Sequence, residues 1–74
     1  MNYFHDMNDL ELSAFYTSWN RAVENNLIKQ DKNIQKALGY FRKNSSIPTA
    51  NCERNLLMEI AERWQKNTIG KGVV

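Results

Sequence analysis

The side chains that could bind a metal ion are few and lie close to the N-terminus. His5 is the only histidine, and Asp6 and Asp9 follow it within four residues. Stable metal sites need several ligands held on rigid elements, and the sequence offers no second histidine or cysteine pair to complete this set. We therefore expect no metal site, and no feature of the sequence indicates a cofactor.

Cys52 is the only cysteine and the only candidate nucleophile that merits discussion. It lies near the start of a predicted helix, where a thiol pKa can be lowered. A nucleophilic cysteine also needs a general base, and no second histidine or other base stands at a recognisable spacing. The sequence has no glycine-rich phosphate loop, no paired catalytic carboxylates and no GxSxG motif. We predict no catalytic residues and a protein that is not an enzyme.

The strongest functional signal is a basic segment, "KNIQKALGYFRKN", at residues 32–44. On a helical wheel its lysines fall in one sector opposite Ile34 and Phe41, with a glycine in the same sector. The predicted partner-binding face, which we call the basic face, consists of Lys32, Lys36, Gly39, Tyr40, Arg42 and Lys43. The glycine leaves a flat area for close approach, and the tyrosine can stack or hydrogen-bond.

Three interpretations of the basic face stay open: a solvated helix surface, a contact for nucleic acid, and a contact for an acidic protein surface. Three or four phosphate contacts bind weakly at physiological salt, so a nucleic-acid binder of this kind would need to be a dimer. The charge distribution suits an acidic partner or self-association. Residues 1–28 carry a net charge of −3 and residues 29–44 a net charge of +4.

A helix-turn-helix is a further nucleic-acid hypothesis. Side chains able to contact base edges gather at the start of the predicted third helix, namely Thr49, Asn51, Arg54 and Asn55. The preceding linker, residues 44–49, lacks the glycine expected in the tight turn of this motif. The hypothesis therefore ranks below protein binding.

A secondary patch is predicted from apolar residues that do not fit the helical stripes. Leu10 and Met58 point away from those stripes, and Tyr3 and Phe4 precede the first helix. Either the N-terminal arm folds back and covers Leu10, or these four residues form a protein-binding patch.

The elements that must position these residues are three helices. The first is predicted at about 9–25, where Asn8 and Glu11 form a capping box and two asparagines at 25–26 can supply a left-handed stop. The second is predicted at 32–43, after an Asp31 N-cap. The third is predicted at 48–67, with the only proline in its first turn.

Each predicted helix carries an apolar stripe. The first comprises Leu12, Phe15, Trp19, Ala22, Val23 and Leu27. The second comprises Ile34, Ala37, Leu38 and Phe41. The third comprises Ala50, Leu57, Ile60, Ala61 and Trp64, with Leu56 at its edge. No segment alternates with the period of a strand, so we predict an all-α, compact three-helix bundle.

The bundle is expected to occupy residues 1–74 as one domain, with a short arm at 1–7 and a frayed tail at 68–74. One cysteine and no apolar run of about 20 residues favour a cytoplasmic protein without a membrane span. Ten asparagines and one proline are typical of AT-rich bacterial or phage genes. We expect a small protein-interaction module (an adaptor, regulator or inhibitor, able to self-associate), with a dimeric nucleic-acid-binding regulator as the alternative.

Overall fold

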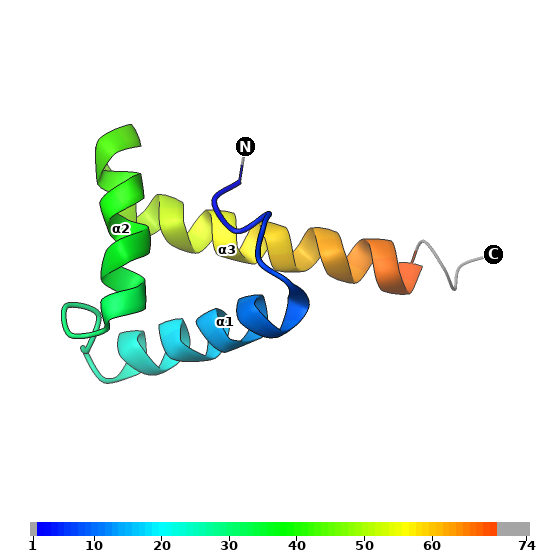
Figure 1. Ribbon diagram of the computed structural model, residues 1–74, viewed down its shortest axis with the longest axis horizontal. Coiled ribbons are helices and arrows are strands. Elements are labelled where there is room, and N and C mark those ends of the chain that lie inside the picture. The colour runs from blue at the N-terminus through cyan, green and yellow to red at the C-terminus, as the bar shows by residue number, and fades with distance from the viewer. Residues whose placement is uncertain (1, 70–74) are drawn as a thin grey trace.

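The computed structural model describes residues 2–69, which form an N-terminal arm and three α-helices. These helices are α1 (Asp9–Glu24), α2 (Lys32–Asn44) and α3 (Pro48–Trp64), and a π-helical turn, η1 (Gln65–Ile69), continues α3. Figure 1 shows that α1 and α3 run in opposite directions and that α2 crosses the N-terminal end of α3 at a steep angle. The prediction of an all-α three-helix bundle is confirmed. The predicted tail begins within η1, and residues 70–74 lie outside the described residues.

Local sequence signals explain where the helices begin and end. The Asn8 side chain accepts a hydrogen bond from the Glu11 N–H at 2.8 Å, and the Glu11 carboxylate accepts one from the Asn8 N–H at 3.0 Å. Asn26 adopts the predicted left-handed conformation, with φ of 55°. The Asp31 carboxylate caps α2 by accepting the N–H groups of the second and third helical residues, and Pro48 is the first residue of α3.

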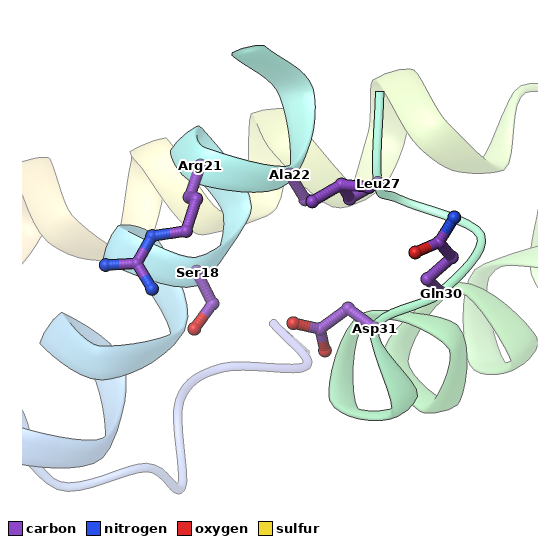
Figure 2. A pocket seen from close by; sticks show the side chains of 6 residues that line it. All are labelled: Ser18, Arg21, Ala22, Leu27, Gln30 and Asp31. Carbon is purple, nitrogen blue, oxygen red and sulfur yellow. The ribbon is translucent and has the colours of Figure 1, made fainter. Parts of the chain in front are cut away.

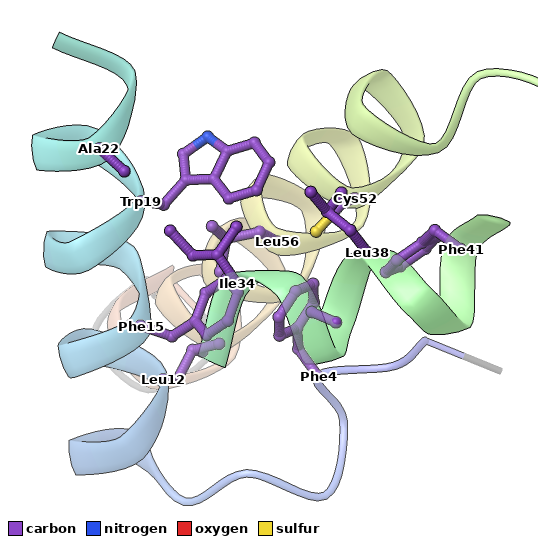
Figure 3. Packing of buried hydrophobic residues seen from close by; sticks show 11 residues of the cluster. Phe4, Leu12, Phe15, Trp19, Ala22, Ile34, Leu38, Phe41, Cys52 and Leu56 are labelled. Carbon is purple, nitrogen blue, oxygen red and sulfur yellow. The ribbon is translucent and has the colours of Figure 1, made fainter. Parts of the chain in front are cut away.

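The core is formed by one face from each helix and by one residue of the arm. Its buried apolar residues are Phe4, Leu12, Phe15, Trp19, Ala22, Ile34, Ala37, Leu38, Phe41, Cys52 and Leu56 (Figure 3). The stripe predicted on α2 is buried completely as expected. On α1, four of the six predicted residues are buried, whereas Val23 and Leu27 near its C-terminal end are exposed.

The predicted stripe on α3 is confirmed only in part, because the helix is rotated relative to the prediction. Leu56, predicted at the edge of the stripe, is fully buried, and Ile60 packs against the core. Cys52 and Glu59 are buried on the same face. Leu57 and Trp64, which were predicted to be core residues, are exposed at 47% and 58%. The helix therefore has one apolar face toward the other helices and a second one toward solvent.

The N-terminal arm is an ordered part of the core. Phe4 is 0% exposed, and its ring lies 4.9 Å from Phe15 and 6.3 Å from Phe41, measured between ring centroids. Asn2 ties the arm to α3 by donating its side-chain N–H to the Asn55 carbonyl at 2.8 Å. The arm folds back as one hypothesis proposed, but it does not cover Leu10, which is 79% exposed.

None of the helices in the described part of the chain combines the length and the apolar character that a membrane crossing requires.

Candidate functional site

The basic face lies on the side of α2 opposite the core. Lys32, Lys36 and Lys43 are all exposed. The helix has no acidic residue along its 13 positions, and no α2 cation forms an ion pair within residues 2–69. Since opposite charges on the same helix would offset these lysines, their absence leaves a positive surface that faces solvent.

An aromatic pair borders the lysines. Tyr40 is exposed, and its ring centroid lies 5.0 Å from that of Tyr3 and 5.1 Å from that of Phe41. Tyr3 comes from the arm and is partly buried, and burial raises the pKa of its phenol. The structure therefore adds Tyr3 to the site, next to the basic face rather than in the predicted secondary patch.

Gly39 leaves a flat area between the lysines because it has no side chain. A Cβ atom added at this residue would meet no neighbouring atom within 4 Å. Packing inside the protein therefore does not require a glycine at this position. The open space is available to whatever contacts the face from outside.

Arg42 stands apart from the other predicted members of the face. Its guanidinium donates a hydrogen bond to the Gln35 side chain at 3.0 Å, and Gln35 in turn donates to the Ile28 carbonyl at 2.8 Å. Two residues along a helix correspond to a rotation of about 200°, so Arg42 and Tyr40 lie on opposite flanks. The site that the structure brings together is Lys32, Lys36, Gly39, Tyr40 and Lys43, with Tyr3 added.

A shallow hollow of about 390 Å³ adjoins this face between the arm, α1 and α2. Tyr3 and Lys36 line it together with Met7, Glu11 and Phe15. It could receive a side chain from a partner. Its size is at the low end of the range for small-molecule sites.

A second depression, of about 230 Å³, lies between the end of α1 and the start of α2. Figure 2 shows Ser18, Arg21 and Asp31 around it. The Asp31 carboxylate is already used as the N-cap of α2. The depression is smaller than most ligand pockets, and no general base accompanies the serine there.

The four residues proposed for base contacts divide into two pairs. Asn51 donates its side-chain N–H to the Ser45 hydroxyl, and Asn55 donates to the Asn51 carbonyl at 2.8 Å. Both asparagines are partly buried. Asn51 supports the junction of α2 and α3 through Ser45, whereas Asn55 bonds within α3 and accepts the Asn2 side chain of the arm at its carbonyl. Thr49 and Arg54 remain exposed.

The secondary patch loses Phe4, which is a core residue. Leu10 on α1 and Met58 on α3 are exposed as predicted. Tyr3 packs against Tyr40 instead. The four residues therefore do not act as one surface.

Cys52, His5 and Asp9 were considered for catalysis or metal binding, and in the structure they lie in the core or beside ion-pair partners. Cys52 is buried, and burial raises the pKa of its thiol to about 12, so its place near the start of α3 does not lower this pKa. His5 Nδ1 lies 3.6 Å from a carboxylate oxygen of Glu59, and Asp9 pairs with Arg63 at 3.0 Å. Within residues 2–69, no group of three or more His, Cys, Asp or Glu side chains is arranged to bind a metal ion.

Comparison of the chain with known protein families, with curated proteins and with solved structures gives no match in any of the three.

Proposed function

We propose that this chain is a small non-enzymatic helical module that binds an acidic surface of another protein through the basic face of α2. The observation that supports this most is the combination of exposed lysines with a tyrosine pair of which Tyr40 is exposed and Tyr3 partly buried. Lys36 lies on one helix with Lys32 and Lys43, no acidic residue is interspersed, and the two tyrosines stand at the edge. Tyrosine is enriched at protein interfaces, and complementary charges steer two proteins toward each other.

The two kinds of side chain would contribute differently to binding. Exposed lysines attract an acidic surface over several ångströms and raise the association rate. The Tyr3 and Tyr40 rings, once covered by the partner, would slow dissociation because buried aromatic area dominates the energy of an interface. The open surface at Gly39 allows the partner backbone to approach α2 closely.

Nucleic acid is the second candidate, and it uses the same lysines. The exposed positions of Thr49 and Arg54 at the start of α3 favour it. Against it, Asn51 and Asn55 are engaged within the fold. One protomer also offers too few phosphate contacts for tight binding at physiological salt. We therefore rank binding to an acidic protein first.

The test is affinity capture from cells of the source organism with the wild-type chain and a Lys36→Glu/Lys43→Glu variant. We expect a partner that the wild-type chain captures and the variant loses, and whose binding weakens with added salt. A matched control is Arg21→Glu/Lys66→Glu, which makes the same change in net charge away from α2 and should retain the partner. Partners that are identical for all three chains would contradict the proposal.

A parallel titration separates the two candidates. A fluorescein-labelled duplex of about 20 base pairs is titrated with the wild-type chain and with both variants. The titration is repeated over a salt series, because log affinity for DNA falls linearly with log salt concentration. Salt-sensitive binding that the α2 variant loses would assign the face to nucleic acid instead. Equal anisotropy with and without protein at low salt would exclude the nucleic-acid function.

A further inference from the structure

The solvent side of α3 is unusually apolar for an exposed helix. Leu57, Met58 and Trp64 are exposed there, and so is Ile47, the N-cap residue directly before the helix. Ala50 and Ala61 lie between them, and a shallow depression of about 430 Å³ runs over this part of the helix. Apolar residues that gather in one exposed patch mark an interaction site, whereas single exposed ones do not.

The spacing of these residues is that of a helix-pairing seam. We define the outer stripe of α3 as Ile47, Ala50, Arg54, Leu57, Ala61 and Trp64. Its members are separated alternately by three and four residues, which is the spacing of the a and d positions of a heptad repeat. Five of the six are apolar, and the exception is Arg54. The stripe therefore suits another helix, rather than a loop or a small molecule.

The order of side-chain sizes along the stripe fits a second copy of itself. Ala50 lies seven residues before Leu57, and Trp64 lies seven residues after it. When two copies pair in opposite directions about Leu57, the small Ala50 of each copy meets the large Trp64 of the other. Twofold symmetry makes this favourable pairing occur twice.

The charge on the stripe favours the same antiparallel arrangement. Arg54, its one charged member, precedes Leu57 by three residues. A parallel pair would bring Arg54 against its own copy, whereas an antiparallel pair about Leu57 sets the two arginines six residues, or about 9 Å, apart along the helices. No ion pair within residues 2–69 offsets this charge.

Access to the stripe is open at its C-terminal end. In Figure 1 the last turns of α3 extend past α2 and the arm. Trp64, at this end, is 58% exposed. A partner helix could therefore lie along this end of α3 without displacing another described element.

From the spacing, the sizes and the charge, we propose that the outer stripe of α3 binds a second copy of this chain, with the two α3 helices antiparallel. The proposal concerns a different face from the basic face, so either can fail alone. The dimer would carry two basic faces on one particle and would thus increase its avidity for an acidic surface.

The first experiment measures molar mass by sedimentation over a concentration range from about 1 to 500 μM, a range that brackets the affinities of modest dimers. We expect the mass to rise from 8.7 kDa to twice that value. Leu57→Asp should weaken the association by at least about a hundredfold, because it buries a charge at the centre of the seam. Leu10→Asp is the matched control, since it introduces the same charge at an exposed leucine on α1, and it should dimerise normally.

The second experiment is a size exchange that only the antiparallel pair predicts. Ala50→Trp and Trp64→Ala should each weaken the dimer about tenfold, because the first sets two large side chains against each other and the second leaves two small ones. The double variant should restore the affinity to within about threefold of wild type. A wild-type chain that is monomeric at the highest concentration, an unaffected Leu57→Asp dimer, or a double variant no tighter than the single ones would overturn the proposal.

Discussion

Arg63 and Glu59 form a hydrogen-bonded ion pair within α3, Nε to Oε2 at 2.8 Å, and the Arg63 guanidinium also joins this helix to the N-terminal arm. Besides contacting Glu59, which raises the pKa of Arg63, the guanidinium donates to the carbonyl groups of His5 at 3.2 Å and Met7 at 2.6 Å. It also contacts Asp9 at 3.0 Å. One side chain thus binds the backbone of the arm and the first turn of α1 and also donates to Oε2 of the buried Glu59 carboxylate, whose Oε1 accepts no hydrogen bond among the described residues.

Replacement of Arg63 by methionine should release the arm. The variant leaves the Glu59 carboxylate buried without its cation, a strongly destabilising arrangement, and removes the donors to the arm carbonyls. We expect a lower urea midpoint and faster hydrogen exchange at the amides of His5 and Met7. NMR measures the urea midpoint and the exchange rates of these amides.

The matched control is the double variant Arg63→Met/Glu59→Met. It removes the buried charge together with its partner, which is often close to neutral for stability. We expect its urea midpoint to lie above that of Arg63→Met, while the arm amides remain fast in both. Equal midpoints would show that burial of the carboxylate is not the source of the loss.

Phe4 should be as important as any residue of the helices. Its removal to alanine would leave a cavity under the arm and should cost about 3–5 kcal/mol of unfolding free energy. Phe4→Leu should cost clearly less, and Leu10→Ala, at an exposed position, should stay within about 0.5 kcal/mol of wild type. Urea denaturation measures all three. A loss below about 1 kcal/mol for Phe4→Ala would show that the arm does not close the core.

Cys52 should make the stability depend on pH in the alkaline range. Burial raises the pKa of its thiol from 9.0 to about 12, so between these values the unfolded chain loses a proton that the folded chain keeps. The free energy of unfolding is therefore unaffected below about pH 9 and falls above it, by at most about 1.4 kcal/mol per pH unit.

The measurement for Cys52 is urea unfolding at several pH values, compared with a Cys52→Ala variant that has no thiol. The difference in unfolding free energy between the two proteins should be constant up to about pH 9 and then shrink or reverse. The comparison cancels the larger part of the Tyr3 effect, because burial raises the pKa of that phenol in both proteins, whereas the smaller contribution from Cys52 is absent in the variant. A constant difference up to pH 11 would contradict the burial of the thiol.

Gly39→Ala should stabilise the free protein. The added Cβ meets no atom within 4 Å, and alanine gains about 1 kcal/mol over glycine inside a helix. Thermal or urea unfolding tests this directly. A partner that packs closely on α2 should bind the same variant less tightly, so opposite effects on stability and binding would locate the contact at this residue. A loss of stability would contradict the open space.

The helices that have strong local signals could be predicted from the sequence. The Asn8–Glu11 capping box and the Asp31 cap depend on residues within three positions of each other, and the structure contains both. Exposure of Lys32, Lys36 and Lys43 followed from the helical wheel in the same way. These features need no knowledge of the distant chain.

The orientation of α3 could not be predicted in this way. Two apolar stripes compete on this helix, and spacing alone favours the one with Leu57 and Trp64. The observed face contains Glu59, which a wheel assigns to solvent. Its burial depends on Arg63 and on arm carbonyls more than 50 residues away along the chain. The contribution of Tyr3 to the site was missed for the same reason, because only the folded arm places it beside Tyr40.

The contact between the arm and α3 also sets an order of events at the ribosome. The Asn2 side chain and the Phe4 carbonyl meet their partners on α3 only after the chain has been extended through Arg63, which takes roughly 3 to 12 seconds from the synthesis of the arm at ordinary rates. During this interval the arm is not fastened to α3, and the phenyl ring of Phe4 lacks the complete core that buries it in the finished fold. Each newly made molecule thus has a period in which chaperones can bind a segment that the finished protein hides.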